Sequence, residues 1–144
     1  MSPITPVVAN HIVLNQDLNH HQTLYGGRTA EWFIQAGLMA TCRWTPPQDT
    51  VCAHLHGLGF AVPVQLGETV TFVGRAVLAG RTSILTHVDV TVGDRAIMDG
   101  FLTFVIVDDA GRPRPHGMSL DPVTELDREL QQQAREIRRQ VVGR

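Results

Sequence analysis

The stretch NHHQTLYGG at residues 19–27 carries several groups that can take part in acid–base chemistry. An imidazole exchanges protons near neutral pH, so His20 or His21 can orient a water molecule or donate a proton to a leaving group. Asn19 can hold that water or fix the loop. The other interpretation is a polar loop in which Asn19 and Gln22 only brace the turn. The sequence leaves both interpretations open.

Gly26 and Gly27 directly precede a long apolar segment that we expect to form a helix. The first N–H groups of a helix lack internal partners, and the helix N-terminus carries partial positive charge. A glycine lets a ligand oxygen approach these groups closely, and N–H groups aimed at a carbonyl stabilise the oxyanion that forms there. Alternatively, the two glycines only permit a sharp turn.

The expected helix covers residues 28–43 and has apolar side chains on nearly every face, so we predict that it is buried on most sides. Glu31 and Gln35 are four residues apart and therefore lie on the same side. A carboxylate on an otherwise apolar helix either reaches solvent or is held for a reason, because burial of an unpaired carboxylate is costly. Glu31 is thus a candidate catalytic acid or base.

From residue 51 onward the hydrophobic pattern has a period of two, which indicates β-strands. Four strands are predicted, at residues 51–60, 69–78, 83–92 and 96–107. Short turns between sequential strands favour an antiparallel sheet, and the economical arrangement wraps that sheet around the apolar helix. The predicted fold class is therefore α+β.

The chain is predicted to form a single domain over residues 1–144, with an N-terminal segment at 1–16 and a C-terminal helical extension at 119–144. The extension begins with Asp121 before Pro122 and places acidic residues early and arginines late, which suits the helix dipole. We expect this helix to be largely solvated.

Composition excludes several classes of function. The formal net charge is -2 and all basic residues are arginines, so nucleic-acid binding is not expected and lysine Schiff-base chemistry is excluded. No apolar run approaches the roughly 18 residues of a membrane span, and we expect a cytoplasmic protein without membrane contact. Cys42 and Cys52 are predicted to be reduced, buried thiols. The spacing of histidines and cysteines predicts no metal site.

The order of several short motifs resembles one known family. These are N-x-x-x-x-x-x-G-G before the helix, Ala36-Gly37 within it, F-x-x-P-V-x-x-G-E at 60–68, G-R-T-S at 80–83 and TFVIVDDAGRPRP at 103–115. The set resembles the hotdog-fold acyl-CoA thioesterases of the acyl-CoA hydrolase type over about residues 15–116. The resemblance implies a hotdog fold, hydrolysis of an acyl-CoA thioester without a further cofactor, and a homodimer with sites at the subunit interface. It also implies higher assembly, as a trimer of dimers or a tetramer.

The resemblance also implies roles for individual residues. Gly27 takes the position whose N–H polarises the thioester carbonyl, and Gly26 adjoins it. The positions expected near the nucleotide and phosphates of CoA are Arg81, Thr82, Ser83, Arg112 and Arg114. Arginine suits such contacts because its planar guanidinium can bind phosphate oxygens in pairs.

The sequence departs from its relatives at the catalytic carboxylate. Many members of the family have an aspartate or asparagine four residues before the second glycine, where this chain has Thr23. Others carry an acid seven or eight residues into the helix, where this chain has Ile34 and Gln35. Glu31 is the remaining acid in the region, so it is the candidate base or nucleophile, assisted by a side chain of the 19–23 loop.

Two alternatives remain. A hotdog dehydratase or hydratase acting on acyl thioesters would need a histidine and an acid placed across the acyl chain, and no D-x-x-x-x-H pattern is present. A non-catalytic acyl-CoA binding protein is consistent with Thr23 in place of the usual loop acid.

Overall fold

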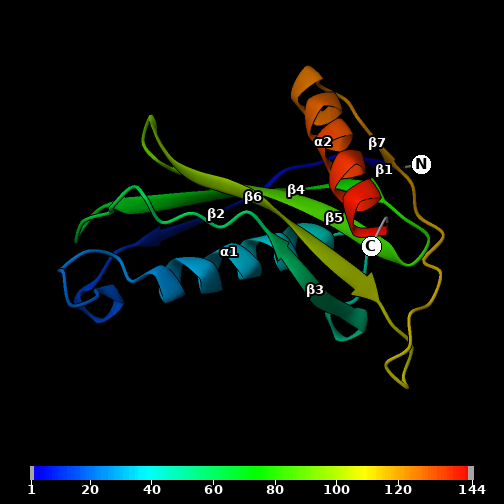
Figure 1. The fold of residues 1–144 in the computed structure, drawn as a ribbon, viewed down its shortest axis with the longest axis horizontal. Helices are drawn as coiled ribbons and strands as arrows, with labels where there is room; N and C mark the ends of the chain where they lie inside the picture. The colour runs from blue at the N-terminus through cyan, green and yellow to red at the C-terminus, as the bar shows by residue number, and fades with distance from the viewer. Residues whose placement is uncertain (1, 143–144) are drawn as a thin grey trace.

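The computed structural model describes residues 2–142. Its main body is a five-stranded sheet in the order β2-β4-β5-β6-β3, in which every neighbouring pair is antiparallel. The strands are β2 (Val7–Ile12), β3 (Thr50–His56), β4 (Thr69–Ala79), β5 (Ser83–Val92) and β6 (Arg95–Ile106). Helix α1 (Gly26–Thr41) lies along one face of the sheet, and α2 (Glu125–Val142) lies on the other (Figure 1).

Shorter elements complete the chain. Strands β1 (Ser2–Pro3) and β7 (Leu120–Asp121) form a separate parallel pair, and two 3-10 turns, η1 (Asn15–Asp17) and η2 (Pro47–Asp49), precede α1 and β3. The pairing of β1 with β7 ties the N-terminal residues to the segment that leads into α2 (Figure 1).

The predicted strands at 69–78, 83–92 and 96–107 agree with β4, β5 and β6 to within a residue or two. The predicted strand at 51–60 is too long, because β3 ends at His56 and Gly57 then turns with φ +82°. Strand β3 also pairs with β6 at the edge of the sheet and leaves Cys52 exposed, so the prediction that both thiols are buried is wrong. Strand β2, on the opposite edge, was not predicted.

Helix α1 packs tightly against the sheet through one face. Phe33 is fully buried among sheet residues such as Phe72 and Phe104. A Cβ atom on Gly74 of β4 would lie 2.9 Å from the Ala36 carbonyl oxygen, so this glycine sets how closely the helix approaches the strands. One side of α1 is open, while its other sides are buried or partly buried, as predicted. That exposed stripe consists of Gly27, Glu31, Gln35 and Met39.

Helix α2 is docked on the sheet through one face, while most of its described residues are exposed, as expected for a largely solvated helix. Its Leu130 and Ala134 are buried, and Gln131 Nε2 donates hydrogen bonds to the carbonyl oxygens of Val77 (3.0 Å) and Leu120 (3.1 Å). The helix begins at Glu125 and not at Asp121, because Thr124 and Asp127 cap it reciprocally. No helix within residues 2–142 is long and apolar enough to cross a membrane.

Candidate functional site

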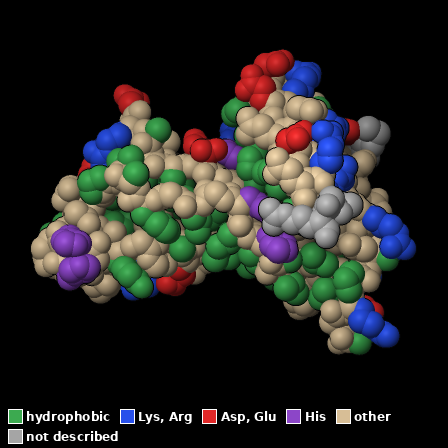
Figure 2. Space-filling view, in the orientation of Figure 1, with side chains coloured by type: hydrophobic (Ala, Val, Ile, Leu, Met, Phe, Trp, Pro, Cys, Tyr) green, Lys and Arg blue, Asp and Glu red, His purple; other side chains and the backbone are tan. Residues whose placement is uncertain are grey.

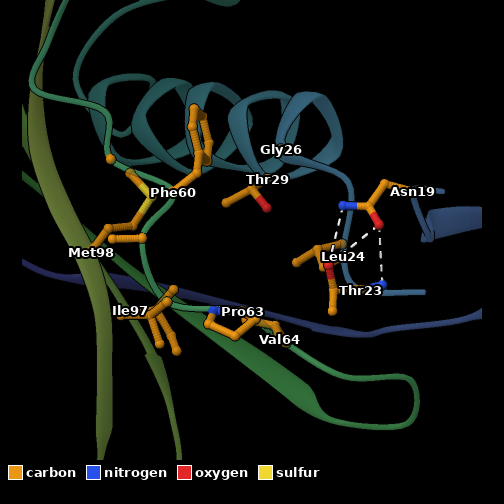
Figure 3. Close-up of a pocket in the computed structure, with 13 residues that line it drawn as sticks. Asn19, Thr23, Leu24, Gly26, Thr29, Phe60, Pro63, Val64, Ile97 and Met98 are labelled. Carbon is orange, nitrogen blue, oxygen red and sulfur yellow. Dashed lines mark hydrogen bonds between the residues drawn. The ribbon is translucent and has the colours of Figure 1, made fainter. Parts of the chain in front are cut away.

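A cavity of about 220 Å³ lies beside the N-terminal turn of α1. Its walls come from the loop before α1, from the connection between β3 and β4, and from the start of β6 (Figure 3). The lining residues are Asn19, Thr23, Leu24, Gly26, Thr29, Gly59, Phe60, Ala61, Val62, Pro63, Val64, Ile97 and Met98. None of these side chains is ionisable, so the cavity wall of this chain offers hydrogen bonds and apolar surface but no acid or base.

The connection that forms one wall is held in place by Glu68. Its Oε1 accepts hydrogen bonds from the Gln65 backbone N–H (2.8 Å) and from Arg95 Nη2 (3.0 Å). The Gln65 N–H and then the Arg95 guanidinium lower the pKa of Glu68. Arg95 is the first residue of β6. Its contact with Glu68 therefore links the β3–β4 connection to the start of β6, which are two walls of the cavity.

Asn19 and Thr23 form a hydrogen-bonded unit at the polar end of the cavity (Figure 3). Asn19 Oδ1 accepts from the backbone N–H groups of His21 (2.8 Å) and Thr23 (3.2 Å), while Asn19 Nδ2 donates to Thr23 Oγ1 (3.1 Å). These contacts fix the loop. An amide nitrogen carries two hydrogens, so one remains for a ligand or water.

The two glycines begin α1, and Tyr25 is the N-cap residue. Neither glycine has a positive φ, so a sharp turn does not require them. Each lies against an aromatic ring: a Cβ atom would come within 3.4 Å of Phe60 at Gly26 and within 2.4 Å of Tyr25 at Gly27. The Tyr25 carbonyl accepts the N–H groups of Arg28 and Thr29, whereas no backbone acceptor in residues 2–142 meets the N–H groups of Gly26 and Gly27.

Glu31 reaches solvent. Its side chain is 51% exposed and its carboxylate lies 3.2 Å from Arg28 Nη1. Arg28 Nε in turn lies 3.2 Å from the buried carboxylate of Asp17, which also accepts the Leu14 N–H. The network anchors the N-terminal turn of α1 to η1. Glu31 does not line the cavity and shares the exposed stripe with Gly27.

His20 and His21 are both exposed, with ring centroids 4.0 Å apart, and neither lines the cavity. The structure therefore brings Asn19, Thr23 and Gly26 together and leaves the paired histidines on the outer side of the same loop.

The predicted CoA-binding residues gather at the other end of the sheet. His116 connects their two segments, because its N–H donates to the Arg81 carbonyl (3.2 Å) and its Nε2 lies 2.9 Å from the Ser83 carbonyl. Thr82 accepts the Ile106 N–H, Arg112 pairs with Asp108 (3.6 Å) and Arg114 pairs with Asp49 (3.1 Å).

This arginine end lies far from the cavity within one chain. Strand β4 starts beside the cavity and its eleven residues lead to the 80–82 turn, a separation of about 35 Å at the usual rise of a strand. Figure 1 shows the turn after β4 and the loop between β6 and β7 at the end of the sheet away from the start of α1.

Sequence reasoning missed several residues of the cavity wall, including Thr29, Ile97 and Met98. Thr29 is buried one turn after Gly26, so helical spacing from the glycine could have indicated it. Ile97 and Met98 belong to β6, which lies near α1 only because of the order of the strands in the sheet. No local sequence pattern indicates that they line the cavity.

The histidines of β3, His54 and His56, do not line this cavity. Burial, and then the neighbouring His54, lower the pKa of His56, whose Nε2 lies 2.9 Å from Thr103 Oγ1. Partial desolvation by neighbouring groups raises the pKa of the otherwise exposed Cys52 thiol. Within the described residues, no group of three or more His, Cys, Asp or Glu side chains is arranged to hold a metal ion.

Comparison with known proteins adds to this geometry. The sequence profile of the Thioesterase superfamily matches residues 21–98. The uncharacterized acyl-CoA thioester hydrolase YkhA of Bacillus subtilis (strain 168) is 28% identical over 115 residues, which cover 76% of this chain and 66% of that protein. The chain thus spans just under two thirds of that relative's length.

Solved structures share the fold. An acyl-CoA hydrolase from Staphylococcus aureus, in complex with butyryl coenzyme A, coenzyme A and coenzyme A disulfide, superposes with a TM-score of 0.83 at 23% identity, over 95% of this chain and 84% of that one. Cj0915 of Campylobacter jejuni, a hexameric hotdog fold thioesterase, superposes with a TM-score of 0.65 at 20% identity, over 85% of this chain and 93% of that one. The predicted α+β hotdog fold is confirmed.

Proposed function

Since this chain belongs to the thioesterase superfamily, we propose that it hydrolyses acyl-CoA thioesters at the cavity beside the N-terminus of α1. The observation that carries the proposal is the pair of N–H groups of Gly26 and Gly27, which begin α1 and have no backbone acceptor among the described residues; Gly26 lines the cavity and Gly27 follows it on the exposed stripe. Such donors stabilise negative charge on a carbonyl oxygen.

In the proposed reaction, the thioester carbonyl oxygen accepts these N–H groups while a water molecule attacks the carbonyl carbon. The attacking water passes a proton to the general base, the oxyanion collapses, the carbon–sulfur bond breaks, and the base transfers that proton to the CoA thiolate. No metal or redox cofactor takes part. Asn19 and Thr23, at the polar end of the cavity, hold the water or the substrate through the remaining amide hydrogen.

Glu31 is the proposed base or nucleophile. Because its carboxylate lies on the exposed stripe of α1 and not in the cavity of its own protomer, it acts beside Gly27 or across a subunit interface. His20 and His21 are the other candidates, and they too need a substrate or a partner subunit that reaches the outer side of the loop.

A homodimer, at least, is proposed because β3 is an unpaired edge strand. Its Val51 and Leu55 are exposed, and Figure 2 shows hydrophobic side chains on the surface over the region of α1 and β3. Open apolar edges favour pairing with another strand. Antiparallel pairing of two β3 strands about a two-fold axis turns one protomer end for end, so the partner's arginine end lies on the side of this protomer's cavity.

We expect light scattering to give at least a dimer. Val51→Glu introduces two like charges at a paired β3 edge, so this variant should dissociate and lose most of its activity. Val8→Glu is the matched control, because it places the same charge on an exposed valine of the other edge strand, β2. A monomeric wild-type protein with full activity would exclude the dimeric site.

Arg81→Ala should weaken CoA binding about tenfold and leave the rate of the chemical step within about threefold, because the guanidinium is proposed to contact phosphate and not the carbonyl. Calorimetry at increasing salt should show a steep loss of affinity for the wild type and a shallower one for the variant. Arg128→Ala on α2 is the control. Equal affinities for wild type and Arg81→Ala would remove Arg81 from the site.

The alternative of a non-catalytic acyl-CoA binding protein gains support from the lack of an ionisable side chain among the cavity-lining residues. A panel of acyl-CoAs incubated with a thiol reagent tests the alternatives. Release of free CoA supports the thioesterase, a changed acyl group without CoA release supports a hydratase or dehydratase, and binding without either reaction supports the binding protein.

A further inference from the structure

The cavity has two chemically different ends. Asn19, Thr23 and Gly26 supply polar groups at one end, whereas Phe60, Ile97 and Met98 supply apolar side chains at the other (Figure 3). A thioester bound with its carbonyl at the N-terminus of α1 therefore extends its acyl chain toward the start of β6.

Phe60 at the rim of the apolar end is exposed, but toward the core this end is bounded by packed side chains. Ile97 and Met98 are partly buried and pack against the core cluster that contains Phe33 and Val90. Val64, next to them in the wall, is only 3% exposed. A chain that continues past Met98 has to displace packed core side chains, and such overpacking is costly.

The volume of the cavity limits the length of the acyl chain that it can hold. A cavity of about 150 Å³ is sufficient to hold a benzene molecule, and this cavity measures about 220 Å³. By proportion it holds about six to nine non-hydrogen atoms. After the carbonyl group is placed at the polar end, room remains for an acyl group of about four to eight carbons in total.

We propose that the substrates are CoA thioesters of unbranched aliphatic acids with about four to eight carbons, and that Met98 sets the upper limit. This inference rests on the proposed thioesterase function. Met98 suits the end of the cavity because its flexible side chain fills the space that short chains leave empty.

The test is kcat/KM for saturated acyl-CoAs from two to sixteen carbons. While methylenes enter the cavity, each should raise kcat/KM by about fourfold, the equivalent of ~0.8 kcal/mol per buried methylene. Beyond about eight carbons the value should fall at least tenfold. Met98→Ala should move the maximum two to four carbons longer, whereas Val62→Phe, which narrows the wall, should move it shorter.

Ile137→Ala is the matched control, because Ile137 is a partly buried side chain packed on the second core cluster, away from the cavity. Its maximum should stay at the wild-type chain length. Melting temperatures show which variants are folded. If Met98→Ala is not folded, the chain-length maximum of Val62→Phe still tests the proposal.

The outcomes separate the two proposals. Hydrolysis with a maximum at twelve or more carbons, or a maximum that neither cavity variant moves, overturns the chain-length inference and leaves the thioesterase function standing. Failure to release CoA from any acyl-CoA overturns the proposed function itself.

Discussion

Glu31→Gln should lower kcat by about a hundredfold to ten-thousandfold, which is the usual effect of losing a general base. The amide is nearly isosteric with the carboxylate but has no negative charge to activate water. Because the side chain is exposed and its ion pair is with Arg28 on the same helix, we expect little change in melting temperature. The affinity for CoA should also stay within about threefold, because the carboxylate is not proposed to contact the nucleotide.

Glu136→Gln is the matched control for this variant. Glu136 is also exposed and also pairs with an arginine three residues away, Arg139, so it reports the cost of removing such an ion pair. The contrary result is a Glu31→Gln enzyme with activity within about threefold of wild type. If His20→Ala or His21→Ala then loses activity, the base belongs to the loop.

Gly26→Pro should lower kcat by about a hundredfold or more, because proline removes one of the two N–H groups that stabilise the oxyanion. The substitution suits the backbone. Gly26 is the first residue of α1, a position that accepts proline, and the extended conformation of Tyr25 (ψ 128°) is compatible with a following proline. The N–H lost has no backbone acceptor in the described chain, so melting temperature should not fall.

Gly26→Ala distinguishes the role of the backbone N–H group from the need for a glycine at this position. Alanine keeps the N–H, and its Cβ would meet Phe60 at 3.4 Å, an ordinary contact. We expect this variant to keep activity within about threefold of wild type. If Gly26→Pro is as active as Gly26→Ala, the oxyanion contact belongs to Gly27 alone or lies elsewhere.

Local patterns predicted much of the fold. The apolar segment after Gly27 forms α1, and alternation marks β4, β5 and β6. Strand β2 was not predicted, because its six residues become alternately half-buried and exposed only when the strand pairs with β4. One of its inward side chains is the polar His11, whose ring stacks on that of Trp32 with centroids 4.4 Å apart. Helix α2 is largely exposed as expected, but its docked face was not predicted, because the buried Gln131 and Asp127 are polar residues that find partners only in the folded chain.

The candidate site was less predictable. Asn19 and Thr23 are four residues apart in one loop and form a hydrogen-bonded pair. Gly26 begins the helix. Phe60 and Met98 meet the same cavity only because the β3–β4 connection and β6 cross beside α1. The expected arginines lie at the far end of the sheet, and no local pattern in the sequence reports how the proposed dimer is arranged.

The most direct measurement is a crystal structure with a non-hydrolysable hexanoyl-CoA analogue, in which a methylene replaces the thioester sulfur. We predict that the carbonyl oxygen lies about 3 Å from the backbone nitrogen of Gly26 or Gly27, with the acyl chain directed toward Met98. The account is contradicted if the acyl group occupies another site, such as the groove between His54, His56 and the end of α2, while the helix N-terminus contacts only water.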